Sequence, residues 1–303
     1  LALNVITIVV MSTAFFAATV ALVQTDIKKI IAYSTCSQLG YMFFATGVGA
    51  YNVAMFHLFT HAFFKALLFL GSGSVIHAFN DEQNINHMGG VWKKLPYTYS
   101  LMIIGTLALT GFPFLSGFYS KDAIIEFAYL RGNTTGYYAA GIGVITAFLT
   151  SIYSWRLIFK TFHGKYNNKK IEIKEIHESP LVMLIPLIFL SIGAVFAGYT
   201  FKELFVSHDG INSFWQDSIF FLKPLSSEHP PFWFLVLTPS LVILSIPIAY
   251  YLFLKNKELS DRIANVNKPL YNFLLNKWYF DEFYNVIIVK PSKNLGLFLW
   301  KFF

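Results

Sequence analysis

The sequence predicts an all-α fold: a polytopic transmembrane helix bundle of about seven spans, one of them discontinuous, followed by an interfacial C-terminal helical segment. Of its 303 residues, 55% are hydrophobic and only 13% are charged. The apolar residues form solid blocks, whereas a transmembrane barrel would alternate with a period of two. Several blocks reach the roughly 20 residues that a helix needs to cross a hydrocarbon core about 30 Å thick. These observations exclude an ordinary soluble protein.

The expected spans follow the runs without charge. Stretches lacking Asp, Glu, Lys and Arg cover residues 1–25, 30–64, 95–120, 132–155, 179–201 and 229–254. Together with turn signals, they predict crossings near 1–24, 30–50, 54–78, 96–130, 137–162, 180–200 and 232–254. Gly47 and Gly49 separate the second crossing from the third, because glycines mark turns inside an otherwise apolar stretch.

The predicted loops differ strongly in charge. Seven crossings put residues 25–29, 79–95, 163–179 and the tail after 254 on one side. Before the tail, this side carries Lys28, Lys29, Lys93, Lys94, Lys165, Lys169, Lys170 and Lys174. The other loops hold only Arg131, Lys202 and Lys223. The positive-inside rule therefore predicts basic loops on the cytoplasmic or matrix side. The net charge of +7 then reflects topology and contact with phospholipid headgroups, and we expect no nucleic-acid partner.

Two domains are expected from the composition: a transmembrane bundle over 1–255 and a cytoplasmic or matrix-side interfacial segment over 256–303. The second mixes charged residues with Trp, Tyr and Phe, as is typical of a membrane interface. The chain starts at Leu1 rather than Met, and we interpret it as a fragment. Cys36 is the only cysteine, so we expect neither an intrachain disulfide nor an iron–sulfur cluster.

Lys65 lies deep within the third predicted span. It is at least eleven residues from either end, too far for its head group to reach the interface. His57, His61 and Lys65 follow at i, i+4 and i+8, on one face of a helix. Histidine titrates near neutrality, so this face predicts a proton relay. Packing histidines are one alternative. A zinc pair is another, but only loop positions such as His77 and His87 offer a third ligand, and we expect no metal.

Lys121 is the second lysine within a predicted span. Gly111, Pro113 and Gly117 interrupt the apolar run before it, and Asp122 follows directly. A broken helix exposes free backbone groups at membrane depth, where transporters hold ions and protons. We therefore predict a functional lysine, with an ordinary Lys–Asp ion pair as the alternative.

A polar patch opens the second span. Asp26 and Lys28 precede it, and small polar or aromatic residues follow at Tyr33, Ser34, Thr35, Ser37, Gln38 and Tyr41. These side chains could order water along a proton path. They could equally serve as hydrogen-bonding contacts between packed membrane helices.

Four segments carry a resemblance to a known family, and they occur in this order: QTDIKKIIAYSTCSQLGYMF, FHLFTHAFFKALLFLGSGSVIH, NDEQNINHMGG and GFPFLSGFYSKDAI. The chain resembles the antiporter-like membrane subunits of NADH:quinone oxidoreductase, respiratory complex I, and among them subunit L or 5. The resemblance covers essentially the whole chain, and the NDEQNINHMGG loop is its most specific part. It implies the C-terminal part of a longer proton-translocating subunit of an enzyme, driven by electron transfer in partner subunits.

The resemblance also implies roles for single residues. Lys65 would be the central relay lysine, with His57 and His61 linking two half-channels. Lys121 and Asp122 would belong to the half-channel leading outward. Asp26 and Lys28 would lie at the inner end of their helix.

For partners and location, the resemblance implies the other complex I membrane subunits, phospholipid, and protons and water as the transported species. It implies no cofactor in this chain, because NADH, FMN, iron–sulfur clusters and quinone bind to other subunits. The membrane would be the bacterial plasma membrane or the mitochondrial inner membrane.

Two alternative functions remain. One is a subunit of a cation/proton antiporter or of a membrane-bound hydrogenase, which the NDEQNINHMGG loop disfavours. The other is a passive scaffold. Lysines within apolar spans disfavour the scaffold, because inserting a charge into a bilayer is costly.

Overall fold

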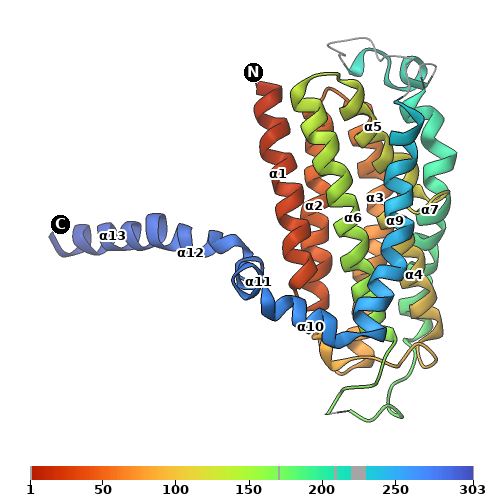
Figure 1. Ribbon diagram of the computed structural model, residues 1–303, viewed down its shortest axis with the longest axis vertical. Helices are drawn as coiled ribbons and strands as arrows, with labels where there is room; N and C mark the ends of the chain where they lie inside the picture. Colours follow the sequence, from red (N-terminus) through yellow and green to blue (C-terminus); the bar gives the residue numbers. More distant parts are fainter. Residues whose placement is uncertain (1, 170, 208–209, 220–229, 303) are drawn as a thin grey trace. The chain divides into compact units, whose positions relative to one another are not determined.

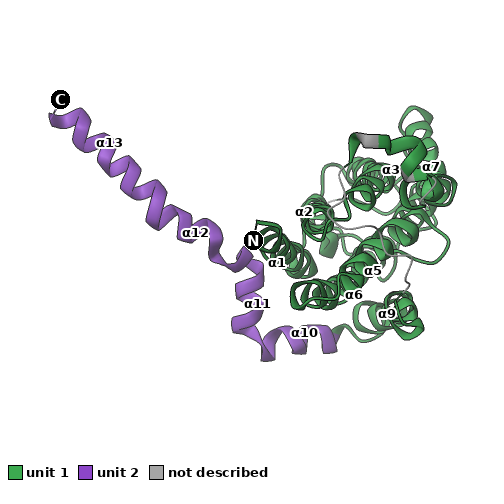
Figure 2. Ribbon diagram, turned by 90° about the horizontal axis from the view of Figure 1, so that it is seen from above, with its two compact units in different colours: residues 1–257 green, residues 258–303 purple. Residues whose placement is uncertain are grey.

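The structure, a computed structural model, describes residues 2–169, 171–207, 210–219 and 230–302, and the elements of these ranges are helices joined by loops. Within these ranges there is no strand. The chain divides into two compact units, Leu1–Lys257 and Glu258–Phe303, drawn in green and purple in Figure 2. The expected all-α fold is confirmed.

The first unit is a bundle of long helices that run side by side (Figure 1). Its helices are α1 (Ala2–Val23), α2 (Ile27–Gly47), α3 (Tyr51–Ala78), α4 (Pro96–Thr110), α5 (Ala123–Leu130), α6 (Thr134–Phe162), α7 (Leu181–Val206) and α9 (Phe232–Tyr250). Small residues allow the closest approaches between backbones. A Cβ added to Gly40 of α2, for example, would lie only 2.7 Å from the Cβ of Ala14 in α1.

Five described helical segments are long and apolar enough to cross a membrane: α1, α3, α6, α7 and Phe232–Lys255, which joins α9 to the π-helical turn η5 (Tyr251–Lys255). They correspond to five of the predicted crossings. Polar residues lower the hydropathy of α2, and a break divides α4 from α5, so neither of these two crossings meets the same measure. The multi-span helical class is confirmed, while seven as a count remains a prediction.

The break in the fourth crossing lies where the glycines and the proline predict it. Helix α4 ends at Thr110, and Gly111 follows with a left-handed backbone, φ 80°. The chain becomes helical again in the π-helical turn η2 (Phe118–Asp122), which leads into α5. A Cβ on Gly117 would collide with the carbonyl oxygen of Ala108, so this close return of the chain requires glycine.

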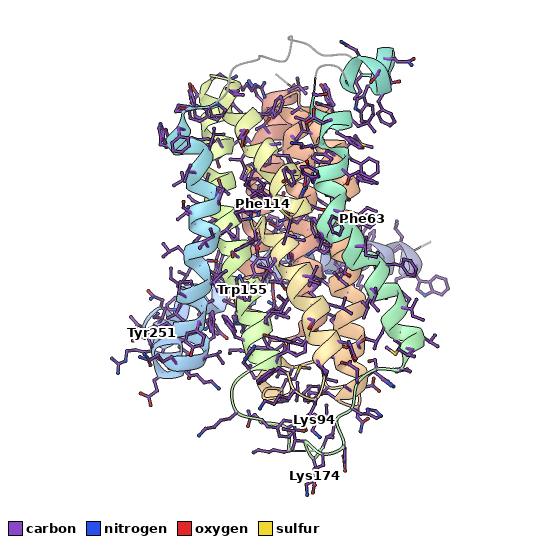
Figure 3. The ribbon with its side chains drawn as sticks, turned by 90° about the vertical axis from the view of Figure 1, so that its right-hand side faces the viewer. Phe63, Lys94, Phe114, Trp155, Lys174 and Tyr251 are labelled. Carbon is purple, nitrogen blue, oxygen red and sulfur yellow. The ribbon has the colours of Figure 1, made fainter. Side chains whose placement is uncertain are left out.

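The loops with the most lysines lie at the same end of the bundle. Figure 3 shows Lys94 and Lys174 together there, in the loops that follow α3 and α6. Both loops are predicted to lie on one side of the membrane, and that sidedness remains a prediction. Two of the predicted loop lysines, Lys170 and Lys223, lie outside the described residues.

The second unit continues as short helices: α10 (Lys257–Val266), which begins at the last residue of the first unit, α11 (Lys268–Leu275), α12 (Phe280–Tyr284) and α13 (Lys290–Phe302). None of the residues in these helices is buried. Large apolar side chains such as Leu297 and Trp300 are exposed among lysines. The predicted interfacial position of residues 256–303 remains a prediction.

Candidate functional site

Lys65 lies in the middle of α3 and is 4% exposed. Its Nζ donates a hydrogen bond to Ser34 Oγ of α2 at 2.7 Å. Tyr153 of α6 donates to the same oxygen through its hydroxyl at 2.6 Å. The ammonium is therefore enclosed by protein and bonded to a hydroxyl of α2, which is bonded in turn to a hydroxyl of α6.

A small cavity adjoins this group. It measures about 10 Å³ and is lined by Ile30, Ile31, Ser34, Lys65, Leu68, Thr106, Leu109, Tyr153, Ser154 and Leu157. This is close to the smallest volume that holds one water molecule. Ser154 Oγ is buried and has no hydrogen-bond partner among the described residues. The cavity thus combines room for one water with several polar walls.

His57 connects α3 to both α2 and the π-helical turn η2. Its ring is fully buried; Nδ1 lies 2.9 Å from Ser120 Oγ, and Nε2 lies 3.1 Å from Gln38 Oε1. Ser120 also lies 2.7 Å from the hydroxyl of Thr60, one turn further along α3. These hydrogen bonds connect the histidine to the π-helical turn that also contains the second buried lysine, Lys121.

His61 lies between His57 and Lys65 on the same face of α3, and all three side chains are buried. The rings of the two histidines are 5.9 Å apart, and His61 Nε2 has no hydrogen-bond partner among the described residues. The predicted stripe is therefore present. The side-chain hydrogen bonds of His57 and Lys65 go to other elements, because four residues of helical rise, about 6 Å, exceed hydrogen-bond length.

Lys121 and Asp122 lie in η2, directly after the break. Lys121 is fully buried, and its Nζ donates to the carbonyl oxygen of Thr110 at 2.5 Å, with that of Leu109 at 3.5 Å. These are carbonyls that the end of α4 leaves without helical partners. Both carboxylate oxygens of Asp122 are buried and accept no hydrogen bond from any described residue. The hydrogen bonds of Lys121 therefore go to the break and not to Asp122.

Asp26 and Lys28 lie at the start of α2, apart from this buried set. Asp26 caps the helix by accepting a hydrogen bond from the Lys29 N–H at 3.0 Å. Lys28 is exposed. The structure thus brings together five of the seven predicted site residues in two neighbouring groups, and places these two at one end of the bundle.

Several polar residues of the interior escaped the sequence analysis. Tyr153, Ser120 and Thr60 are single polar residues in apolar helices, and nothing local distinguishes them from packing residues. For Arg156, the sequence does contain a sign of burial, because this charged residue follows the charge-free run 132–155 inside a span predicted to reach 162. It is 6% exposed, and its Nη1 donates to the carbonyl oxygen of Gln24 at 2.7 Å.

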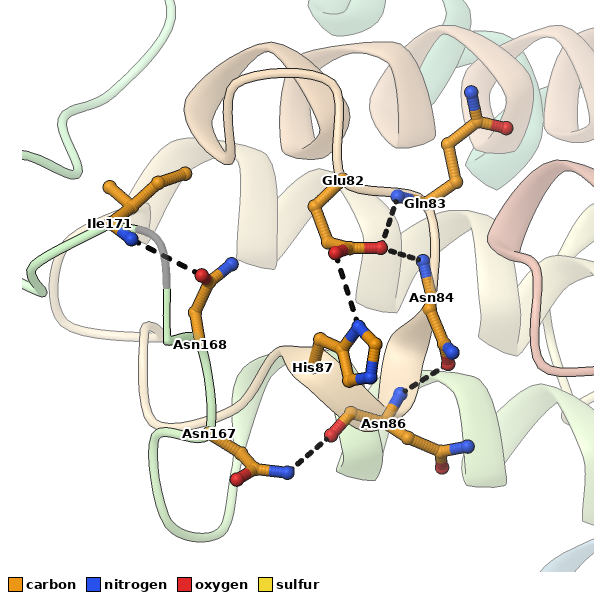
Figure 4. Close-up of polar contacts among 8 residues, drawn as sticks. All are labelled: Glu82, Gln83, Asn84, Asn86, His87, Asn167, Asn168 and Ile171. Carbon is orange, nitrogen blue, oxygen red and sulfur yellow. Dashed lines mark hydrogen bonds and ion pairs between the residues drawn. The ribbon is translucent and has the colours of Figure 1, made fainter.

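The loop after α3 is organised around one carboxylate (Figure 4). Glu82 Oε1 accepts the backbone N–H groups of Gln83 and Asn84 at 3.0 and 2.8 Å, and Oε2 lies 3.1 Å from His87 Nδ1. Burial by itself raises the pKa of Glu82, but these hydrogen bonds outweigh it and hold the pKa below its usual range. The most specific segment of the sequence is thus a loop built on an ionised carboxylate.

Metal ligation finds no support in the donor set. Among the described residues, no group of three or more His, Cys, Asp or Glu side chains could hold a metal ion. His57 instead uses both ring nitrogens for hydrogen bonds to protein groups. The arrangement is suited to holding and moving protons.

Comparison with known proteins agrees with this reading of the fold. Residues 1–150 match the family described as NADH:quinone oxidoreductase/Mrp antiporter, TM. The chain is 50% identical to NADH-ubiquinone oxidoreductase chain 5 of Phytophthora infestans over 97% of this chain and 45% of that protein. It is 41% identical to NADH-quinone oxidoreductase subunit L of Rhodobacter capsulatus over 95% of this chain and 50% of that protein. The chain thus spans about half the length of these relatives.

Two solved structures share the fold. One is the archaeal membrane-bound sulfane sulfur reductase, with TM-score 0.59 and 26% identity over 64% of this chain and 32% of that chain. The other is the Mrp complex from a Dietzia species, with TM-score 0.64 and 21% identity over 96% of this chain and 32% of that chain. The family match over residues 1–150, together with the similarity of almost all of this chain to chain 5 and subunit L, shows that this integral membrane chain belongs to the NADH:quinone oxidoreductase/Mrp antiporter membrane family.

Proposed function

We propose that this chain forms part of a proton-translocating membrane subunit of NADH:quinone oxidoreductase. The supporting observation is the enclosed lysine at the centre of the bundle: Lys65, 4% exposed in an apolar helix, bonded to a hydroxyl and beside a cavity that fits one water. A charge placed at such depth costs several kcal/mol unless it is satisfied, and such groups line ion and proton paths. In this proposal Lys65 is the central proton carrier.

The other site residues have roles on either side of Lys65. His57 and His61 pass protons along α3, and Ser120, which is bonded to His57, leads toward the turn that holds Lys121. Lys121 and Asp122 hold the proton at the broken helix before its release on the outer side. Asp26 and Lys28 lie where protons enter from the basic, cytoplasmic or matrix side.

Energy for this transport comes from elsewhere in the proposed complex. Electron transfer from NADH to quinone, through FMN and iron–sulfur clusters in partner subunits, shifts charge along the membrane arm and changes the proton affinity of Lys65. This chain binds no redox cofactor. Its partners are the other membrane subunits and phospholipid, in a bacterial plasma membrane or a mitochondrial inner membrane.

The test is Lys65→Ala in the intact complex. We expect assembled enzyme that pumps fewer protons per NADH oxidised, because the central carrier is missing. Lys94→Ala, which removes an exposed loop lysine, is the matched control and should pump normally. Wild-type pumping by a fully assembled Lys65→Ala enzyme would eliminate the relay role.

A cation/proton antiporter is the second candidate, favoured by the likeness to the Mrp complex structure. The two candidates differ in their driving force. Proton movement that requires NADH and quinone supports the first. Exchange of Na⁺ for protons by the assembled membrane complex without electron transfer would support the second.

A further inference from the structure

The two buried lysines have different kinds of hydrogen-bond partner. Lys121 Nζ is bonded to backbone carbonyl oxygens, those of Thr110 and Leu109. Lys65 Nζ is bonded to the hydroxyl of Ser34, which is bonded in turn to the hydroxyl of Tyr153. A carbonyl oxygen can only accept a hydrogen bond, whereas a hydroxyl can accept and donate. The two lysines therefore differ in which charge states their partners can satisfy.

A lysine that carries protons changes its hydrogen-bonding needs with each cycle. The ammonium has three donors and no acceptor, while the neutral amine presents a lone pair that accepts. In a dry interior, a polar group left without a partner costs about 1–3 kcal/mol. A carbonyl partner can accept from either state, but it leaves the lone pair of the neutral amine without a donor. A serine hydroxyl fits both states, because its O–H can turn.

Tyr153 completes the arrangement around Ser34. With Lys65 charged, Ser34 Oγ accepts from Lys65 and from Tyr153, which occupies both of its lone pairs. With Lys65 neutral, the Ser34 O–H can turn toward Nζ while Tyr153 still donates to Ser34 Oγ. The bonds then run in one direction, from Tyr153 through Ser34 to Lys65, and such a chain strengthens each of its members.

We propose that Ser34 and Tyr153 are positioning residues that hold Lys65 Nζ in one place in both of its charge states. They neither gain nor lose a proton, and only the direction of the Ser34 O–H changes. The three side chains come from α2, α6 and α3 and are 1%, 1% and 4% exposed, so bulk water does not substitute for them. This inference rests on the proposed relay role of Lys65.

The adjoining cavity supports the same assignment. Ser34, Lys65 and Tyr153 all line it, together with Ser154, whose Oγ has no partner among the described residues. Most of the cavity wall is apolar, but a single water beside Nζ would meet these polar side chains and give a proton a place to arrive or leave. Fixing Nζ at the edge of that space shortens each transfer, since transfer requires hydrogen-bond contact.

The experiment asks whether the hydroxyl groups of Ser34 and Tyr153 are needed for pumping, or whether these side chains only fill space. Ser34→Ala, Ser34→Thr and Tyr153→Phe are made in the intact complex, and protons pumped per NADH oxidised are measured in sealed vesicles beside Lys65→Ala. We expect the ratio of protons pumped per NADH in Ser34→Ala to fall nearly to that of Lys65→Ala. The ratio in Tyr153→Phe should lie between those of Lys65→Ala and wild type. Ser34→Thr, which keeps the hydroxyl, should stay close to wild type.

A purely packing role predicts the opposite order. Ser34→Ala is smaller and Tyr153→Phe loses one oxygen, so both would keep the wild-type ratio, while the extra methyl of Ser34→Thr would disturb a filled interior. Ser72→Ala is the matched control: Ser72 is also buried, but its hydroxyl bonds only to the Phe69 carbonyl of its own helix. It should pump normally.

The outcomes separate this inference from the proposed function. Normal pumping by Lys65→Ala would overturn the relay role and this inference with it. Reduced pumping by Lys65→Ala with wild-type ratios in Ser34→Ala and Tyr153→Phe would overturn the positioning role alone. Tyr153→Phe, being nearly isosteric, decides the matter even where Ser34→Ala fails to assemble.

Discussion

At the scale of single residues, the buried titratable groups of the bundle differ in their hydrogen-bond partners. Lys65 is bonded to a hydroxyl, Lys121 to backbone carbonyls and His57 to a hydroxyl and an amide. The Asp122 carboxylate accepts no hydrogen bond from the described residues. Partner chemistry decides which protonation state each group holds at little cost. The groups of the site thus differ in the protonation state that their partners favour.

Among these groups, Asp122 should be the most sensitive to replacement of its carboxylic acid. Asp122→Asn keeps the size of the side chain but cannot exchange a proton, and general acid–base groups typically contribute about a hundredfold or more. We expect proton release through this subunit to fall by about that factor, measured as initial proton flux in vesicles. Asp261→Asn, the same change on a partly exposed helix, should have no effect. Equal flux in both variants would contradict a role for Asp122.

At the scale of elements, the interruption between α4 and α5 determines what Lys121 can bond to. Helix α4 ends at Thr110, and the chain returns so closely at Gly117 that a side chain there would meet the Ala108 carbonyl. The carbonyls at the end of α4 are thereby left free for the ammonium. The two glycines act as parts of the site without carrying any reactive group.

Gly117→Ala should therefore damage the break. The added Cβ collides with backbone, which cannot move aside as a flexible side chain would, and overpacking of this kind costs about 3 kcal/mol or more. We expect a sharp drop in assembled complex and in its thermal unfolding midpoint. Gly141→Ala is the control: no atom lies within 4 Å of its added Cβ, and helix propensity favours alanine by about 1 kcal/mol. A Gly117→Ala complex as stable as Gly141→Ala would refute the close return.

The loop after α3 is held by an ionised carboxylate, and this makes it sensitive to acid. The folded-state pKa of Glu82 is depressed below its usual range, so its stabilising effect is present above the unfolded pKa of about 4.3 and is lost as pH falls through the folded value. Amide hydrogen exchange at Gln83 and Asn84, corrected for intrinsic rates, should speed up over that window. In Glu82→Gln it should be fast at every pH. Protection in Glu82→Gln equal to that of the unsubstituted protein would argue against this role of Glu82.

At the scale of the whole molecule, the positions of the loops allow a test of whether α6 crosses the membrane, as the seven-span topology requires. The loops that contain Lys94 and Lys174 share one end of the bundle (Figure 3). In a parent with Cys36→Ser, a cysteine at Glu175 should react with an impermeant maleimide from the cytoplasmic or matrix side. A cysteine at Thr134, at the start of α6, should react only from the opposite side. Labelling of both from one side would rule out the seven-span topology.

Local patterns predicted much of this architecture. Charge-free runs predicted where the long helices lie, because the composition needed to cross a bilayer is a property of each segment alone. The break at Gly111 and Gly117 was predictable for a similar reason, since backbone freedom belongs to the residue itself. The common face of His57, His61 and Lys65 followed from helical spacing.

The partners of these residues were decided only by tertiary structure. Ser34 and Tyr153 are 119 residues apart in sequence, and Lys65 is 31 residues from Ser34, so no local spacing relates them. Their meeting depends on how α2, α3 and α6 pack. The sequence by itself determined a helical membrane chain with charges inside it, because hydropathy and turn chemistry act locally. Tertiary packing decided which hydroxyls, amides and carbonyls face those charges, because hydrogen bonds form only between atoms that packing brings within about 3 Å.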